Sequence, residues 1–388
     1  MNPNSSTTHL RNARLVLPDR VVAASLVIAD DRIVRIGDGL SASPSDKEID
    51  ARGLTIFPGF IDVHIHGAVG VDTMAASADG LKAVSTYLAS RGVTGWLPTF
   101  VPAAAANYAT AVDAINAAAT EKTGAQILGV HYEGPFVNSS QCGALHTEYF
   151  RSFEGPNDLA DLPQLRHPKA KHMITVAPEI EGGIDLIREL TRRGWIVSLG
   201  HTRASAAVLD EACAAGASHM THFMNAMAPL HHRAPGPVGW GLLRDDVTCD
   251  LIADGIHLEP QTLRLLLKLK TAARLSLISD AVAAAGKGDG SYEIWGETIT
   301  VTNGRTANAR GSIAGSVISM LDAVRMMLSL GTSETEVARM ASTNPATLLG
   351  MAEERGSIAE GKRADLVALD ANQEVAFTMI GGQAKDEG

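Results

Sequence analysis

The middle of the chain alternates short apolar runs with Ala- and Leu-rich stretches of helical character, and this alternation restricts the possible folds more than any other feature. Apolar strands that alternate with helices are typical of parallel βαβ units. We count eight apolar runs, which is the number of strands that closes a (β/α)8 barrel. The runs span residues 55–66, 92–99, 126–133, 172–178, 195–201, 217–225, 247–257 and 274–280. The helical stretches between them include residues 79–91, 102–119, 183–193, 205–215 and 259–270.

An open, doubly wound parallel sheet is the alternative architecture for the same alternation. Open sheets that bind dinucleotides carry a glycine-rich fingerprint in the turn after their first strand. The turn after the first apolar run of this chain lacks that fingerprint. We therefore predict an α/β protein whose central domain is a (β/α)8 TIM barrel.

The two ends of the chain differ from the middle because their apolar runs are short and β-like. These runs lie at residues 13–16, 23–28 and 32–36, and again at residues 364–369 and 375–379. Turn-forming residue pairs separate them, as in consecutive strands of one sheet. We expect the two ends, residues 1–57 and 355–388, to pair into one small β-sheet domain beside the barrel domain at residues 58–354.

The composition limits which kinds of binding partner and which cellular compartment we expect for this protein. The formal net charge of −10 argues against a nucleic-acid or anionic membrane surface, and aromatic residues, needed for base stacking, make up only 4% of the chain. No apolar run approaches the length of a membrane span, and the N-terminus does not resemble a signal peptide. The three scattered cysteines, Cys142, Cys213 and Cys249, fit a reducing compartment. We expect a soluble cytoplasmic protein that binds neither nucleic acid nor membranes.

Several of the apolar runs end in a residue that can bind a metal ion or transfer a proton. Catalytic groups of a (β/α)8 barrel sit at the C-terminal ends of its strands, so these residues should converge on one mouth of the barrel. The first run, IDVHIHG, places two histidines two residues apart, on the same face of a strand, with Asp62 behind them. The strand-end residues are His64, His66, Glu133, His201, His222, His257 and Asp280.

A single buried histidine is more often a satisfied core residue than a ligand, so the joint pattern carries the prediction. Histidine nitrogens and carboxylate oxygens are ligands of zinc and of similar divalent ions. We interpret His131 and His219, which lie within apolar runs, as core residues or as supports behind the ligands. His9, His167 and His172 have no such partner set, and we expect them at the surface or at a boundary.

A series of motifs runs along the chain, namely PGFIDVHIHG, GVHYEGPF, LGHT, THFMNAMAPLHHRAPG, LIADGIHL, LISDA, GSIAGS, NPA and GSIAEGKRADLVALD. By these motifs the chain resembles, from about residue 54 to residue 368, the amidohydrolase superfamily, and within it the branch that deacetylates phosphorylated amino sugars. The resemblance implies a (β/α)8 barrel with a small β-sandwich domain built from both chain ends. Many relatives bridge two metal ions with a carboxylated lysine at the end of the fourth strand, but here that strand ends TVAPE, without lysine.

The resemblance implies that Glu133 replaces that lysine and holds the principal metal ion together with His201 and His222. His64 and His66 resemble ligands of a second ion. We therefore expect one or two divalent ions per subunit, zinc first, with iron or another transition metal as the alternative. Asp62 would orient a histidine from behind.

The activity implied is hydrolysis of N-acetylglucosamine 6-phosphate to glucosamine 6-phosphate and acetate. Asp280 would take the proton of the attacking water and deliver it to the leaving amine, and His257 would grip the sugar or its carbonyl. From the residues alone, Asp280 has an alternative role, because an aspartate at a strand end often caps the following helix.

The motif APLHHRAPG places His231, His232 and Arg233 in a loop after the sixth strand. A guanidinium binds phosphate through paired hydrogen bonds, although a solvated surface loop would look the same in the sequence. The resemblance makes Arg233 a phosphate ligand that reaches across a dimer interface, so we expect a homodimer. Other substrate contacts that the resemblance implies are Asn225, Ala226, Ile313, Ala314 and Gly315.

One segment departs from the pattern of the resembling sequences, which usually have a basic stretch and Gly-Ala-His after Gly-Pro-Phe. Here NSSQCGALHTEYF lacks the basic residues and inserts Leu145 before His146, a further candidate substrate contact. The change could favour the galacto epimer or another N-acyl substrate. A different amidohydrolase and a catalytically silent barrel used for binding are the remaining alternatives.

Overall fold

The central architecture is a barrel of eight parallel strands. The computed structural model describes residues 7–40, 47–119 and 124–385. Adjacent strands follow one another in chain order, and backbone hydrogen bonds from Asp280 N to His64 O (2.9 Å) and from His66 N to Ala281 O (2.8 Å) join the last strand to the first. The barrel strands are β6 (Phe60–Ile65), β9 (Val93–Phe100), β11 (Gly129–Glu133), β12 (Lys171–Val176), β13 (Ile196–Leu199), β14 (His219–Met220), β15 (Thr248–Ile252) and β16 (Leu275–Ile278). The predicted (β/α)8 barrel is confirmed.

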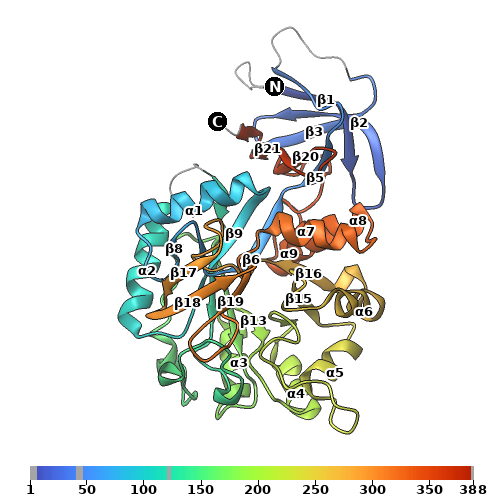
Figure 1. The fold of residues 1–388 in the computed structure, drawn as a ribbon. Helices are drawn as coiled ribbons and strands as arrows, with labels where there is room; N and C mark the ends of the chain where they lie inside the picture. Colours follow the sequence, from blue (N-terminus) through green and yellow to red (C-terminus); the bar gives the residue numbers. More distant parts are fainter. Residues whose placement is uncertain (1–6, 41–46, 120–123, 386–388) are drawn as a thin grey trace.

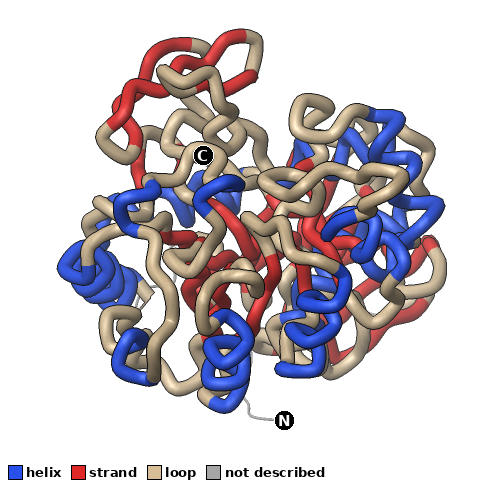
Figure 2. The backbone as a smooth tube through the Cα atoms, turned by 90° about the horizontal axis from the view of Figure 1, so that it is seen from below, coloured by secondary structure: helices blue, strands red, loops and turns tan. Residues whose placement is uncertain are grey.

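Helices and loops surround the strands, as the view from below shows (Figure 2). Ser77 and Ser205 cap α1 and α4, because their side-chain oxygens accept hydrogen bonds from the first turn of each helix. Every residue of β6 and β9 is buried, which is expected of strands covered on both faces. The helices are α1 (Ala78–Ser90), α2 (Ala105–Ala118), α3 (Gly183–Arg192), α4 (Ala206–Ala215), α5 (Gly236–Leu243), α6 (Pro260–Lys270), α7 (Met320–Ser329), α8 (Glu334–Ala338) and α9 (Asn344–Leu348).

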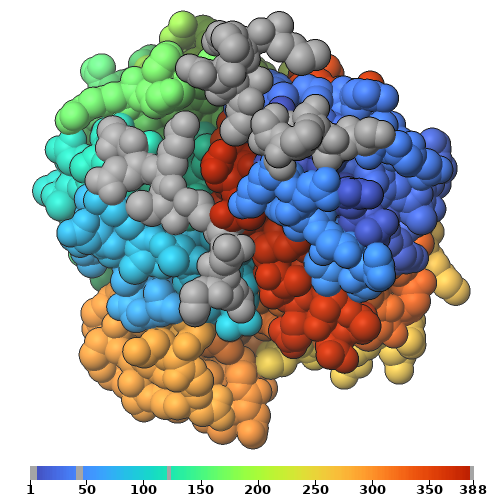
Figure 3. All heavy atoms as spheres, turned by 90° about the horizontal axis from the view of Figure 1, so that it is seen from above, coloured from blue at the N-terminus to red at the C-terminus, as the bar shows by residue number. Residues whose placement is uncertain are grey.

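The two chain ends form one mixed sheet on the same side of the molecule (Figure 1). Seen from above, the C-terminal residues lie beside the N-terminal ones (Figure 3). Leu10, Leu26, Ile56, Leu366 and Met379 form part of a core of its own inside this sheet. In order, its strands are β22 (Gln383–Lys385), β21 (Val375–Ile380), β20 (Leu366–Leu369), β5 (Thr55–Pro58), β1 (Thr7–Val16), β2 (Val21–Ala29) and β3 (Arg32–Gly37), with β4 (Lys47–Asp50) paired to β1. We propose residues 1–57 and 355–388 as this small domain and residues 58–354 as the barrel domain.

The first apolar run, predicted as one strand over residues 55–66, is two strands in two different sheets. β5 pairs with β1 and β20 of the small sheet, whereas β6 pairs with β9 of the barrel. The strands meet at Gly59, where a Cβ atom would lie 2.2 Å from the side chain of Thr94. Only glycine fits this close approach, so the chain passes here from one sheet to the other without a visible break in its apolar pattern.

A three-stranded antiparallel sheet after β16 was not predicted. It consists of β17 (Gly290–Ile294), β18 (Glu297–Thr302) and β19 (Arg305–Ala307). Ile294, Ile299 and Val301 pack against Val282 and Ala284, next to the end of β16. This small sheet therefore lies close to the mouth of the barrel, where its first turn becomes part of the site described below.

Three very short strands complete the description. β7 (Gly67–Ala68) pairs with β8 (Val71–Asp72), and β10 (Gln126–Ile127) extends the barrel sheet beside β9. The three cysteines are free thiols. Within residues 7–40, 47–119 and 124–385, no helix combines the length and the apolar character that crossing a membrane requires.

Candidate active site

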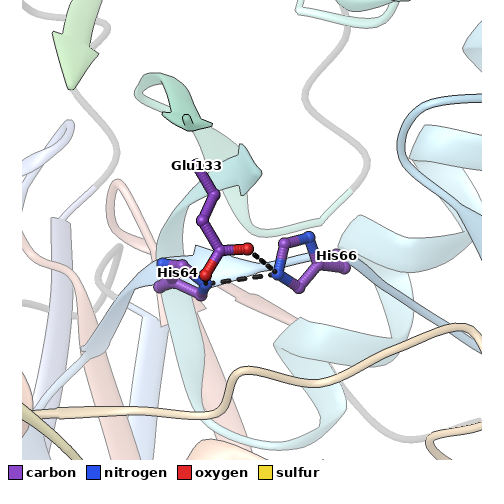
Figure 4. A group of neighbouring side chains, drawn as sticks. All are labelled: His64, His66 and Glu133. Atoms are coloured by element: carbon purple, nitrogen blue, oxygen red, sulfur yellow. Dashed lines mark hydrogen bonds and ion pairs between the residues drawn. The ribbon is translucent and has the colours of Figure 1, made fainter. Parts of the chain in front are cut away.

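The carboxylate of Glu133, at the end of β11, is the centre of the site. Its Oε1 atom lies 2.9 Å from Nε2 of His201 and 2.8 Å from Nε2 of His222. On its other side it faces the first strand, with Oε2 3.3 Å from Nε2 of His66 and Oε1 3.7 Å from Nε2 of His64 (Figure 4). The structure thus brings five predicted ligands together as two sets of three that share Glu133.

The histidines face one another in a way that suits a cation between them. The Nε2 atoms of His64 and His66 are 3.2 Å apart, and those of His201 and His222 are also 3.2 Å apart. Nδ1 of His66 lies 3.3 Å from Thr99 O, and Nδ1 of His201 lies 2.7 Å from Gln141 O. Because a carbonyl oxygen accepts only, these Nδ1 atoms carry protons, and both rings direct their Nε2 atoms at the carboxylate of Glu133. An Nε2 atom that also carries a proton donates it to the carboxylate, and a divalent ion between the two groups would take the place of that proton.

The electrostatics keep Glu133 ionised although it is almost completely buried. Burial alone would raise its pKa, but the charge of His64 and the hydrogen bonds from His201 and His222 lower the pKa well below the usual range. A buried carboxylate in its charged form is a ready metal ligand. The residues therefore fit a site for one or two divalent ions.

Asp280 follows β16 and completes the cluster. Its Oδ1 atom lies 3.3 Å from Nε2 of both His64 and His66. Burial raises its pKa, but the hydrogen bonds and charges of these two histidines outweigh burial and lower the pKa. The next long helix, α7, is capped by Ser319 and not by Asp280, which removes the alternative role of Asp280 as a helix cap.

Three of these residues have an unusual backbone conformation. His201, His222 and Asp280 have φ angles of 48°, 31° and 50°. Left-handed φ values are rare for residues other than glycine, and they cluster at functional sites. The strain is compatible with a site whose side chains are held in place by tertiary contacts.

The cluster opens into a pocket of about 150 Å³. The Nδ1 atom of His257 lies 2.6 Å from Oδ2 of Asp254, which leaves the other side of the ring for a ligand. Asp254 also accepts the backbone N–H groups of Ile256 and His257, and sequence reasoning had not assigned it a role. Predicted substrate contacts that line the pocket are His257, Asn225, Ala226, Ile313 and Gly315. Ala314 is fully buried between two of them.

Besides Ala314, two predicted substrate contacts do not line this pocket. His146 lines a neighbouring groove of about 820 Å³, and its Nδ1 atom lies 3.2 Å from Oε1 of Glu148. Leu145, the residue before it, lines the pocket instead. Arg233 is exposed, and its guanidinium lies 2.9 Å from Nε2 of His232. The roles of His146 and Arg233 stay predictions.

His131 and His219 lie inside the barrel, whereas His9 corrects an expectation. The ring of His131 packs edge-on against His64 and hydrogen-bonds Val63 O and Thr175 Oγ1, and His219 lies 2.8 Å from the buried Asp250. His9, expected at the surface or at a boundary, is buried within β1 because that strand lies inside the small sheet.

Asp62 contacts the backbone and a serine, not a histidine ring. It accepts hydrogen bonds from Ser279 Oγ (2.5 Å) and from the backbone N–H groups of Ser279 and His64. Burial raises the pKa of Asp62 to about 7. Its contacts tie the end of β6 to the end of β16, so Asp62 positions backbone segments that carry His64 and Asp280.

Trp295 is a pocket residue that sequence reasoning missed. It lies in the turn between β17 and β18, and its ring is 5.1 Å from the ring of His66, edge to face. No sequence signal placed it near the histidines, because the sheet that carries it was not predicted.

Comparisons with known proteins agree with this geometry. Residues 55–385 match the Amidohydrolase family. The chain is 38% identical over 385 residues to the N-acetylglucosamine-6-phosphate deacetylase of Bacillus subtilis (strain 168), covering 96% of each chain. It is 37% identical to the N-acetylgalactosamine-6-phosphate deacetylase of Escherichia coli O157:H7, covering 97% of this chain and 99% of the relative. The crystal structure of N-acetylglucosamine-6-phosphate deacetylase from Pasteurella multocida superposes with a TM-score of 0.91 at 30% identity, over 98% of this chain and 100% of that one.

The match to the family covers most of the chain, and it includes every residue of the cluster around Glu133. The chain therefore belongs to the amidohydrolase family. The resemblance inferred from the motifs is confirmed, and so is the class of enzyme, a hydrolase acting on amide bonds.

Proposed function

We propose that this enzyme removes the acetyl group from N-acetylglucosamine 6-phosphate to give glucosamine 6-phosphate and acetate. The observation that carries the proposal is the carboxylate of Glu133, shared by two histidine pairs, with Asp280 against one pair in the same pocket. The names of the relatives from Bacillus subtilis and Pasteurella multocida support the choice of substrate.

The metal part of the proposal is one or two divalent ions per subunit, with zinc as the first candidate and iron or another transition metal as the alternative. Glu133, His201 and His222 would hold the principal ion, and His64 and His66 would join Glu133 around a second one. A bound divalent ion supplies activated water near neutral pH and stabilises negative charge on the amide oxygen.

The protein's own residues perform the proton transfers. Asp280 is ionised in the pocket and accepts the proton of the attacking water. The carboxyl group then gives that proton to the amine as the C–N bond breaks. His257, fixed by Asp254, lines the same pocket and holds the substrate carbonyl or the sugar hydroxyls.

The phosphate end of the substrate would lie against Asn225, Ala226 and the backbone at Ile313 and Gly315. Arg233 would contribute from a second subunit, since its side chain is exposed on the loop after β14 and lies outside the pocket of its own chain. The proposed assembly is therefore a homodimer, and the proposed location is the cytoplasm.

Deacetylation of the galacto epimer is the second candidate. The relative from Escherichia coli O157:H7 carries that name and is nearly as similar as the first one. Leu145 in the pocket wall supports keeping this candidate, because it belongs to the segment that departs from the usual Gly-Ala-His pattern.

Acetate release from the 6-phosphates of N-acetylglucosamine, N-acetylgalactosamine and N-acetylmannosamine, with metal content measured on the same samples, tests the proposal. We expect the highest kcat/KM for the gluco substrate, loss of activity on chelation, and recovery on adding zinc. A preference for the galacto substrate would select the second candidate. Absence of acetate release from every sugar phosphate by metal-loaded enzyme would refute both.

A further inference from the structure

We propose that Trp295 sets the length of the acyl group that this enzyme accepts. The inference rests on the proposed deacetylase function and adds a specificity-determining residue to it. Trp295 lines the pocket together with His66 and Leu145, at the turn between β17 and β18. Its ring lies 5.1 Å from that of His66, with the two planes at 82°. The indole therefore forms the wall directly beside the proposed metal centre.

The wall separates two cavities. Trp295 lines both the pocket of about 150 Å³ around Glu133 and the adjacent groove of about 820 Å³. On the groove side its neighbours include Asp72, Met74 and Val101. Removal of the indole would join the small pocket to the larger groove, in which an acyl chain longer than acetyl has room.

The backbone conformation at residue 295 is one that tryptophan rarely adopts. Ile294 pairs with Glu297, so Trp295 and Gly296 form a two-residue hairpin turn, with φ angles of 55° and 77°. Turns with two positive φ angles favour asparagine, aspartate or glycine at the first of these positions. A tryptophan is strained there, and packing must compensate for the strain.

Packing also makes the wall rigid. Trp295 packs against an apolar cluster that contains Val101, Val137 and Leu145, and on its other side against the core of its own small sheet. Leu145 is 3% exposed and lines the pocket beside it. Two large apolar side chains that share one cluster therefore close this part of the pocket.

The residues that line the pocket differ in chemistry. The side-chain amide of Asn225, which follows β14, suits the polar sugar phosphate, whereas Trp295 and Leu145 suit an apolar group. In the proposed complex the substrate amide would lie next to Asp280, and its acyl chain would take the apolar part of the lining, against the indole.

The test measures kcat/KM for N-acetyl-, N-propionyl- and N-butyryl-glucosamine 6-phosphate by release of the free amine. One methylene in an apolar pocket changes discrimination by about 10- to 200-fold. We expect Trp295→Ala to raise the N-butyryl to N-acetyl ratio by at least about tenfold. Trp295→Phe, which keeps an aromatic wall, should give a ratio close to that of the wild type.

The matched control is Tyr292→Ala in the same hairpin. Tyr292 donates a hydrogen bond to Gly288 O (2.8 Å) and lines neither cavity, so its loss loosens the hairpin without opening the wall. We expect the N-butyryl to N-acetyl ratio of Tyr292→Ala to stay at the wild-type value. An equal rise in Tyr292→Ala, or an unchanged ratio in folded Trp295→Ala, would overturn the inference. If Trp295→Ala does not fold, Trp295→Leu gives the same comparison with a shorter apolar side chain.

A binding measurement separates this inference from the proposed function. Calorimetry of acetohydroxamate and hexanohydroxamate on the metal-loaded protein needs no sugar and no turnover. We expect the wild type to prefer the short ligand and Trp295→Ala to lose that preference. If the wild type releases no acetate from any sugar phosphate, the proposed function fails, and the hydroxamate preference still decides whether Trp295 limits chain length.

Discussion

The Oδ1 atom of Asp280 lies 3.3 Å from the Nε2 atom of His66, on the side of the cluster that faces the pocket. The contact joins the last strand of the barrel to the first, because these residues follow β16 and β6. The carboxylate that we propose as the proton acceptor thereby lies against a candidate metal ligand, although Asp280 belongs to neither of the two candidate ligand sets.

Replacement of Asp280 by asparagine tests its role in proton transfer. Asp280→Asn keeps the size of the side chain but removes the base, so we expect kcat to fall by about 100- to 10 000-fold. Metal content should stay at the wild-type level, as measured by elemental analysis of the same sample. Near-normal turnover in this variant would contradict the assignment.

The number of ions is tested by comparing two sets of ligands. In Glu133→Gln, both predicted sets lose their shared carboxylate, and we expect metal content to fall most strongly in this variant. The double change His64→Asn and His66→Asn removes only the second set. If the native enzyme binds two ions per subunit, this variant should retain one, whereas an unchanged metal content would mean that the pair binds no ion.

Arg233→Ala tests the phosphate end of the site. Loss of a charge-assisted hydrogen-bond pair should raise KM for the phosphorylated sugar by about 10- to 100-fold, with little change in kcat. KM for the unphosphorylated N-acetyl sugar should not change. Arg166→Ala, which removes an exposed arginine that pairs with Asp113, is the control. Equal effects on both substrates would rule out a phosphate contact.

His172 makes folding stability depend on pH. Burial lowers the pKa of His172 to about 4, and its Nε2 atom accepts a hydrogen bond from Leu165 N (2.9 Å). The unfolded chain, with an ordinary histidine pKa of about 6.5, binds the proton more readily, so stability is complete above that pH and falls as the pH drops towards 4.

We expect a loss of about 1–2 kcal/mol over this range, after discounting for the solvent exposure of the half-buried ring. Chemical unfolding of the wild type and of His172→Gln at several pH values across this range measures the loss of stability. The glutamine keeps an acceptor but does not titrate, so the wild type should lose more stability than the variant. Parallel curves would show that His172 is not responsible.

The sequence was sufficient to predict the barrel and the cluster of candidate metal ligands at its mouth. Strand–helix alternation is a local property of the chain, and parallel strands align their carboxyl ends at one mouth. His64, Glu133 and His222 could therefore be placed together before any distance was known, since each lies at or near the end of an apolar run. The pairing of both chain ends was also visible from their short β-like runs.

Contacts between segments far apart in the chain were decided by the tertiary structure alone. The break at Gly59 depends on the side chain of Thr94, and the position of Leu145 in place of His146 depends on how the loop after β11 folds against the barrel. Neither contact leaves a periodic pattern in the sequence.

The sequence by itself thus determined the fold class, the family and the residues gathered around Glu133, because hydrophobic period and strand-end position are encoded locally. The tertiary structure decided the shape of the pocket. Trp295 reaches His66 across more than two hundred residues of chain, and such a contact arises only when separate elements pack together.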